Sequence, residues 1–223
     1  MRYFPRLTEI DEREAVRYAG APADKGVYSQ ATVKLICREV LLMIEPAACW
    51  EEYEYSATKR LVLANDEPYE LSSCNLARHL AGVEKVVLLA VTVGDAVENF
   101  SRRLFAEGRY SEALLAEGAA SAAVEQAADQ ACAYLERQYR QAGLTLTSRY
   151  SPGYGDWKLD EQPNVLRLAK GESIGITLTK SLMLTPKKSI TAIAGWRRRA
   201  DTTPHEISGC AACPKIDCTM RKG

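Results

Sequence analysis

Residues 85–93 read KVVLLAVTV, an apolar run rich in β-branched side chains that decides the fold of the chain. A strand that is apolar at nearly every position is covered on both faces, because a half-exposed strand alternates apolar and polar residues. We therefore expect residues 85–93 to form a central strand with packed layers on both sides.

Two long helices are predicted directly after this strand. Gly94 and Asp95 supply a turn and a helix start, and this helix is expected to run to residue 107, before Gly108 ends it. Residues 111–142 contain no proline and are rich in alanine, which favours helix and permits close packing against a neighbour. This segment is expected to be the longest helix of the chain.

The remaining segments predict a mixed architecture. Their patterns indicate helices at residues 29–44, 72–80 and 160–169, strands at residues 59–64, 174–184 and 189–196, and a short alternating segment at residues 144–147. The last two strands are joined by a predicted turn at Pro186 and Lys187. We expect an α+β fold in which a twisted, mostly antiparallel sheet in the C-terminal half carries long helices packed on it.

The composition excludes several classes of protein. Of 223 residues, 29 are Lys or Arg and 29 are Asp or Glu, so the net charge is zero, whereas a general nucleic-acid binder carries a basic excess. The longest apolar run, residues 86–93, is too short to span a bilayer. Charged residues such as Arg2 and Arg6 replace the apolar stretch of a secretory signal. We expect a cytoplasmic protein that binds neither nucleic acid nor membranes.

Residues 149–156, RYSPGYGD, form the most informative stretch, which we call the Pro-Gly loop. Pro152 and Gly153 favour a tight turn, and the glycine leaves the main chain open to a flat ligand. Arg149 offers a planar donor fork that suits a carboxylate, and Tyr154 offers a ring face and a hydroxyl. The local chemistry alone fits a ligand site and a surface turn over the core equally well.

The pattern R-x-x-P-G-Y at residues 149–154, followed by S-x-M-x-x-P-x-x-S at residues 181–189, resembles the activation domain of cobalamin-dependent methionine synthase. The resemblance covers residues 86–196. It implies that the loop binds S-adenosylmethionine largely through backbone groups, and that an acidic residue on the preceding long helix assists. The loop positions carried over by the resemblance are Arg149, Ser151, Gly153 and Tyr154.

The acidic helper is expected within residues 123–133 of the long helix. Glu125 and Asp129 lie four residues apart and share one helix face, with no Lys or Arg at helical spacing on their N-terminal side. Two like charges on an alanine-rich face favour a nearby cation, which S-adenosylmethionine would bring. The register of the resemblance favours Asp129, with Glu125 second. A solvated face pointing away from the sheet is the alternative.

The resemblance also divides the chain into three parts. Residues 85–199 correspond to the S-adenosylmethionine-binding core, residues 1–84 to an N-terminal α/β extension packed on the main body, and residues 200–223 to a Cys-rich C-terminal tail. Residues 1–84 either form a subdomain or simply extend the sheet, and the sequence leaves both open.

The implied function is the reductive methylation, or reactivation, of cobalamin. The sequence contains no cobalamin-binding pattern of the type D-x-H-x-x-G, so the cobalamin is expected on a partner. That partner would be a corrinoid protein or a cobalamin-dependent methionine synthase lacking its own activation domain, with a flavodoxin- or ferredoxin-type protein as electron donor. Whether this chain is itself an enzyme stays open. A non-catalytic docking protein is one alternative.

The tail carries a separate signal. Cys210, Cys213 and Cys218 follow the spacing C-x2-C-x4-C, which fits a zinc site, an iron–sulfur cluster or a free dithiol. A metal or cluster there favours a further alternative, a redox accessory of an anaerobic corrinoid methyltransferase. The other cysteines are expected to be small, buried apolar residues in a reducing compartment, and they are Cys37, Cys49, Cys74 and Cys132.

Overall fold

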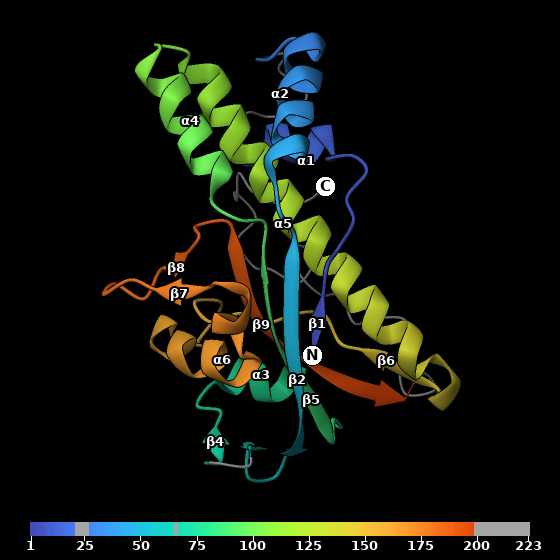
Figure 1. Ribbon diagram of the computed structural model, residues 1–223. Helices are drawn as coiled ribbons and strands as arrows, with labels where there is room; N and C mark the ends of the chain where they lie inside the picture. The colour runs from blue at the N-terminus through green and yellow to red at the C-terminus, as the bar shows by residue number, and fades with distance from the viewer. Residues whose placement is uncertain (21–26, 65–66, 199–223) are drawn as a thin grey trace.

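The computed structural model describes residues 1–20, 27–64 and 67–198 (Figure 1). Within these residues, seven strands form one antiparallel sheet in the order β4-β3-β2-β5-β9-β6, with β1 paired to β2. These strands are β1 (Arg2–Tyr3), β2 (Ala47–Ser56), β3 (Leu61–Leu63), β4 (Tyr69–Glu70), β5 (Lys85–Thr92), β6 (Leu144–Leu146) and β9 (Ser189–Arg198). The predicted α+β fold with an antiparallel sheet is confirmed.

β5 is the central strand of this sheet, and β2 and β9 pair with it along its whole length. Its side chains alternate between two cores. Val87, Leu89 and Val91 face one core, and Val86, Leu88 and Ala90 face the other. The apolar run at residues 85–93 therefore forms a strand covered on both faces, as predicted.

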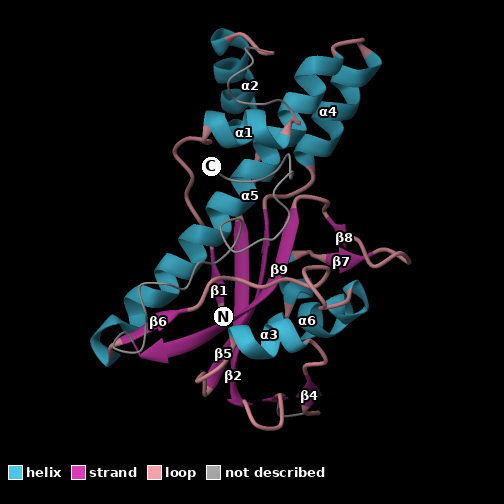
Figure 2. Ribbon diagram, turned by 180° about the vertical axis from the view of Figure 1, so that it is seen from behind, coloured by secondary structure: helices cyan, strands magenta, loops and turns pink. Residues whose placement is uncertain are grey.

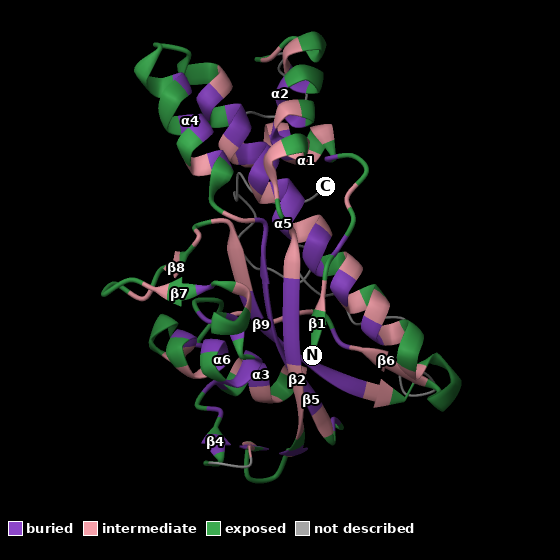
Figure 3. Ribbon diagram, in the orientation of Figure 1, coloured by how far each residue is buried: buried purple, intermediate pink, exposed green. Residues whose placement is uncertain are grey.

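On the first face of the sheet, α5 (Tyr110–Tyr139) packs against the strands, and three other helices of the described residues pack beside it (Figure 1). They are α1 (Glu12–Tyr18), α2 (Gln30–Met43) and α4 (Ala96–Ala106). α5 runs obliquely across the strands, while α2, α4 and the first turns of α5 project beyond the sheet (Figure 1). Figure 3 shows buried residues along α5 and exposed residues at the outer ends of α2 and α4. In the described part of the chain, no helix has the length and apolarity needed to cross a membrane.

Shorter elements cover the second face (Figure 2). They are α3 (Cys74–His79) and α6 (Gln162–Ala169), with the 3-10 turns η3 (Leu159–Glu161) and η4 (Gly171–Ile174). A further 3-10 turn, η2 (Arg140–Ala142), follows α5. The helix predicted at residues 72–80 corresponds to α3, which Ser73 caps, because its hydroxyl accepts a hydrogen bond from the N–H of Leu76 at 2.9 Å.

The sequence did not reveal β2, although it is one of the two longest strands. The reason lies in its glutamates, which interrupt the apolar pattern. Glu52 accepts a hydrogen bond from the Tyr139 hydroxyl at 2.8 Å and lies 3.8 Å from Lys85 Nζ. Because β1–β4 belong to the same sheet as β5 and β9, residues 1–84 extend the sheet, which is therefore not confined to the C-terminal half.

The strand predicted at residues 174–184 is wrong. Within it, β7 (Thr177–Leu178) and β8 (Leu184–Thr185) pair with each other as a separate hairpin. Gly175 and Leu182 adopt positive φ angles of 81° and 63°, which break the extended chain before β7 and at the hairpin turn. Two short strands folded on each other therefore replace the single predicted strand.

The cysteines of the described residues are free, and the expected burial is found in full only at Cys37 and Cys49. Cys37 and Cys49 are buried and Cys132 is half-buried, whereas Cys74 is exposed. Burial raises the pKa of the Cys37 thiol to about 11, so this thiol stays protonated at neutral pH. The prediction of four buried cysteines is therefore wrong for Cys74, which lies in the first turn of α3.

Candidate functional site

The start of the Pro-Gly loop is tied to the outer edge of β9. Tyr150 and Ile193 exchange two main-chain hydrogen bonds of 2.9 and 2.8 Å. Just before the loop, the Thr147 hydroxyl accepts a hydrogen bond from the N–H of Gly195 at 2.9 Å. Since the backbone is held on both sides of Arg149, its pairing with the sheet fixes the position of the Arg149 Cα atom.

Arg149 binds both of the acids that the sequence singled out on α5. Its Nη1 donates to Oδ1 of Asp129 at 2.6 Å, and its Nη2 donates to Oε2 of Glu125 at 2.8 Å. The Arg149 side chain is 18% exposed, against 37% for Glu125 and 70% for Asp129. These three residues, which we call the charged cluster, carry one positive and two negative charges, so the cluster has a net negative charge next to the loop.

Cys132 completes the surroundings of Arg149, with its Sγ 3.8 Å from Nη1. Burial lowers the pKa of the Arg149 guanidinium, but Cys132, Asp129 and Glu125 outweigh that effect, and the pKa lies above its ordinary value. Burial raises the pKa of the Cys132 thiol, which is therefore neutral at physiological pH. Arg149 is the cation that the two acids lacked on their own helix.

The turn of the loop uses several of its own backbone groups. The N–H of Gly153 donates to the carbonyl of Trp157 at 2.7 Å, and the N–H of Tyr154 donates to the carbonyl of Ser151 at 3.2 Å. Gly153 has a φ of 93°, which favours glycine. The Tyr154 side chain is 67% exposed. Pro152 is buried, whereas residues 153–156 are exposed, so the exposed part of the loop begins at Gly153.

The sequence did not predict that the Pro-Gly loop contacts α3. The Asp156 carboxylate accepts hydrogen bonds from the Ser73 hydroxyl and from the N–H groups of Cys74 and Asn75, at 2.9 and 3.2 Å for the two N–H groups. The hydrogen bond from Ser73 is the main cause of the lowered pKa of Asp156. The only sequence signal was the cap-like serine at the start of α3, which has no visible connection to residue 156.

At the other end of α3, His79 Nε2 lies 2.7 Å from the carbonyl oxygen of Ser148, so this nitrogen carries the proton. Burial lowers the pKa of His79 and outweighs the opposing effect of this hydrogen bond. The neutral imidazole therefore acts as a hydrogen-bond donor to the residue that precedes Arg149.

The second half of the motif lies on the β7–β8 hairpin and the start of β9. The Ser181 hydroxyl is 3.0 Å from that of Thr179 within the hairpin turn, and the Met183 side chain is 58% exposed. The Ser189 hydroxyl donates to Thr92 at 2.9 Å. These residues make no recorded contact with the charged cluster.

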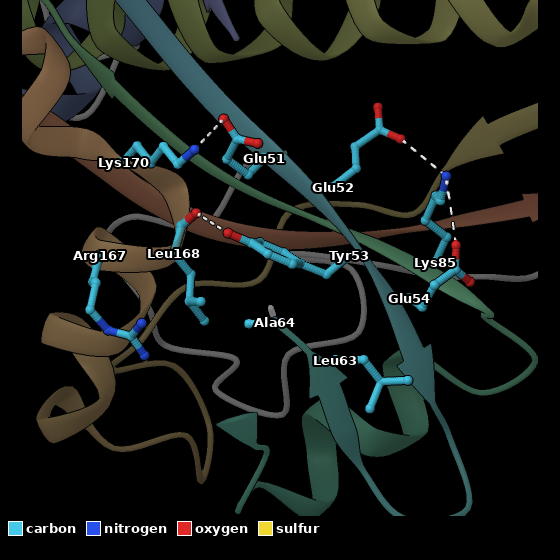
Figure 4. A pocket seen from close by; sticks show the side chains of 10 residues that line it. All are labelled: Glu51, Glu52, Tyr53, Glu54, Leu63, Ala64, Lys85, Arg167, Leu168 and Lys170. Carbon is cyan, nitrogen blue, oxygen red and sulfur yellow. Dashed lines mark hydrogen bonds and ion pairs between the residues drawn. The ribbon is translucent and has the colours of Figure 1, made fainter. Parts of the chain in front are cut away.

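A separate cavity of about 560 Å³ lies beside β2 and α6 (Figure 4). Tyr53 lies across it and donates its hydroxyl to the carbonyl of Leu168 at 2.9 Å. Glu51 faces Lys170 at 3.3 Å on one side. None of the predicted site residues lines this cavity, so it is not the site that the sequence motif predicts.

The predicted metal ligands Cys210, Cys213 and Cys218 lie outside the described residues. Within residues 1–20, 27–64 and 67–198, no group of three or more His, Cys, Asp or Glu side chains is placed to hold a metal ion.

Comparison with known proteins gives a match at the level of structure alone. No protein family matches the sequence, and no curated protein matches it either. Among solved structures, the crystal structure of the MetH reactivation domain bound to AdoHcy matches with a TM-score of 0.54 at 15% identity. The match covers 78% of this chain and 64% of that one, so the chain spans less than two thirds of its structural neighbour. The protein has the fold of the MetH reactivation domain, and the resemblance predicted from the loop motif is confirmed at the level of the fold.

Proposed function

We propose that this protein binds S-adenosylmethionine at the charged cluster and the Pro-Gly loop, and thereby supports the reductive methylation of cobalamin on a separate protein. The observation that carries the proposal is the pairing of Arg149 with Glu125 and Asp129 beside the loop. The fold shared with a reactivation domain bound to AdoHcy supports it.

The charges of the cluster match those of the ligand. S-adenosylmethionine carries a carboxylate, an ammonium and a sulfonium, so it has one net positive charge, opposite to the net charge of the cluster. Arg149 suits the carboxylate through the N–H groups that its bonds to the two acids leave over, and Glu125 and Asp129 suit the cationic groups.

The proposed role of the protein is to position the methyl donor. Cobalamin on its partner, reduced by one electron to Co(I), supplies the electron pair that forms the new bond to the methyl carbon. The carbon–sulfur bond breaks with its electron pair remaining on sulfur, which leaves AdoHcy. No proton is transferred, so the chain needs no general acid or base, and holding the donor in the correct orientation is its contribution.

The partner we propose is a corrinoid protein or a methionine synthase that lacks its own activation domain. The electron would come from a flavodoxin- or ferredoxin-type protein. We place these partners in the cytoplasm, in keeping with the free cysteines of the described residues, because thiols stay reduced there.

Calorimetric titration with S-adenosylmethionine and with AdoHcy tests the proposal. We expect the wild type to bind both and to prefer S-adenosylmethionine, because AdoHcy lacks the sulfonium charge. Glu125→Gln should lower the affinity for S-adenosylmethionine about tenfold, and the affinity for AdoHcy less. Asp129→Asn should have the smaller effect, since 70% of its side chain is exposed to solvent.

Glu39→Gln on α2 is the control for these variants, because Glu39 makes no hydrogen bond or ion pair through its side chain within the described residues. The affinities of this variant should equal those of the wild type. A wild-type protein that binds neither compound at millimolar concentration would contradict the proposed function. Equal loss of both affinities in Glu125→Gln would contradict the charge match.

The cysteine tail gives a further prediction. We propose that Cys210, Cys213 and Cys218 bind a metal, and that anaerobically purified protein contains zinc or iron by elemental analysis. Replacement of all three by serine should remove that metal. Iron with visible absorbance would favour the redox accessory of a corrinoid methyltransferase, whereas zinc would favour the stand-alone activation module. Metal-free protein would contradict the metal site and leave a dithiol.

A further inference from the structure

One short helix holds the Pro-Gly loop at both ends. His79, the last residue of α3, binds the carbonyl of Ser148 at 2.7 Å, immediately before Arg149. Asp156, the last residue of the loop, binds the first turn of the same helix. α3 lies outside the residues that carry the sequence resemblance, so the motif does not predict these contacts.

The hydrogen bonds of Asp156 are not needed to cap α3 at its third position. There the N–H of Leu76 donates to the Ser73 hydroxyl, whereas Asp156 takes the N–H groups of Cys74 and Asn75. Replacing Asp156 therefore removes the link between loop and helix and leaves the N-cap residue of α3 in place.

The segment between the two attachments is closely fitted. A Cβ atom at Gly155 would overlap the hydroxyl of Tyr150 and lie 3.1 Å from Nδ2 of Asn75. Gly155 also has a φ of 56°, and the Tyr150 hydroxyl is 3.3 Å from the carbonyl oxygen of Tyr154. The loop, α3 and the strand edge thus meet at Gly155, and Asp156 holds the loop against the other two.

We infer that α3 holds the Pro-Gly loop in its conformation and that Asp156 is the positioning residue of the S-adenosylmethionine site. This inference rests on the proposed function, and it deepens that function by naming the residue that sets the conformation of the loop. Asp156 acts through the backbone of the turn that carries Gly153 and Tyr154. An ordered loop binds a ligand more tightly because less conformational entropy is lost on binding.

The test compares Asp156→Asn with Asp160→Asn, since Asp160 is exposed, lies in the same region and has no side-chain partner in the part of the chain that the structure describes. The measurements are calorimetric affinity for S-adenosylmethionine, the melting temperature, and hydrogen exchange of the amides of residues 153–155 without ligand. We expect Asp156→Asn to lose about tenfold in affinity and to exchange these amides faster. It should also melt below Asp160→Asn, because the Asp156 carboxylate accepts hydrogen bonds from the N-cap Ser73 and from two N–H groups of α3. Asp156→Glu, which keeps the carboxylate, should recover part of both, and it replaces Asp156→Asn if that variant does not fold.

The outcomes distinguish the positioning role of Asp156 from the proposed function. If the wild type binds S-adenosylmethionine and both aspartate variants bind it equally well, the positioning role is wrong and the proposed function stands. If the wild type does not bind, the proposed function fails, and the exchange rates alone decide whether Asp156 orders the loop. Unchanged exchange of these amides in Asp156→Asn would in either case contradict the inference that α3 holds the loop through Asp156.

Discussion

Arg149→Ala should lower the affinity for S-adenosylmethionine at least 100-fold, which corresponds to about 2.7 kcal/mol. The substitution removes the donor fork proposed for the ligand carboxylate. It also leaves Glu125 and Asp129 as like charges on one face of α5, without the cation that both contact. Calorimetric titration of the variant measures the effect directly.

The same substitution should reduce the stability of the protein. Hydrogen bonds to charged groups contribute about 1.5–3 kcal/mol when buried. Asp129 is 70% exposed and solvent screens its interaction with Arg149, so we expect a loss at or below the lower end of that range, roughly 1–2 kcal/mol. For a protein of this size that corresponds to a fall in melting temperature of about 2–8 °C.

Two further variants separate binding from stability. Arg149→Ala combined with Glu125→Gln and Asp129→Asn removes the repulsion between the acids, so it should regain stability but not ligand affinity. Arg167→Ala is the matched control, because this exposed guanidinium has no recorded side-chain partner in the described part of the chain. Affinity of Arg149→Ala within threefold of the wild type would rule out the charged cluster as the ligand site.

Both halves of the charged cluster were identified from the sequence, but their pairing was not. Glu125 and Asp129 stood out through their helical spacing, and Arg149 through its place before Pro152 and Gly153. Their contact depends on the chain reversing after α5, so that β6 and the loop run back beside the helix along β9. No local pattern encodes the distance between residues that are 20 and 24 positions apart.

The prediction of the fold succeeded where local patterns and burial agreed. The run at residues 85–93 is apolar on both faces and is the central strand. The prediction of the fold failed at β2. There Glu52 contacts Tyr139, which is distant in the sequence, and Glu54 contacts Lys85 on the neighbouring strand. A central strand that contains several charged residues has the sequence pattern of a loop, and only the tertiary structure shows which partners those charges contact.

The attachment of the loop to α3 lay further beyond the reach of the sequence. The residues that meet are 81 to 83 positions apart, and α3 lies in the part of the chain without recognisable resemblance. In the sequence, Asp156 is simply the last residue of the Pro-Gly loop. Its role depends on the packing of α3 against the second face of the sheet.

Gly118→Ala should destabilise the protein by roughly 1–3 kcal/mol, although alanine is the better helix former. Gly118 lies within α5 where α1 crosses it. A Cβ atom there would overlap the carbonyl oxygen of Ala15 and lie 2.7 Å from the main-chain nitrogen of Ala19. Because both atoms belong to the backbone, α1 has to move. The expected fall in melting temperature is about 2–12 °C.

The control for this variant is Ala133→Gly, at an exposed position of the same helix. It measures the intrinsic preference of α5 for alanine, which is worth roughly 1 kcal/mol, and it should lower the melting temperature. If that preference alone governed position 118, Gly118→Ala would raise the melting temperature by a similar amount. A rise would therefore contradict the close crossing of α1 and α5. A fall with unchanged affinity for S-adenosylmethionine would show that this crossing supports the fold independently of the charged cluster, two helical turns further along α5.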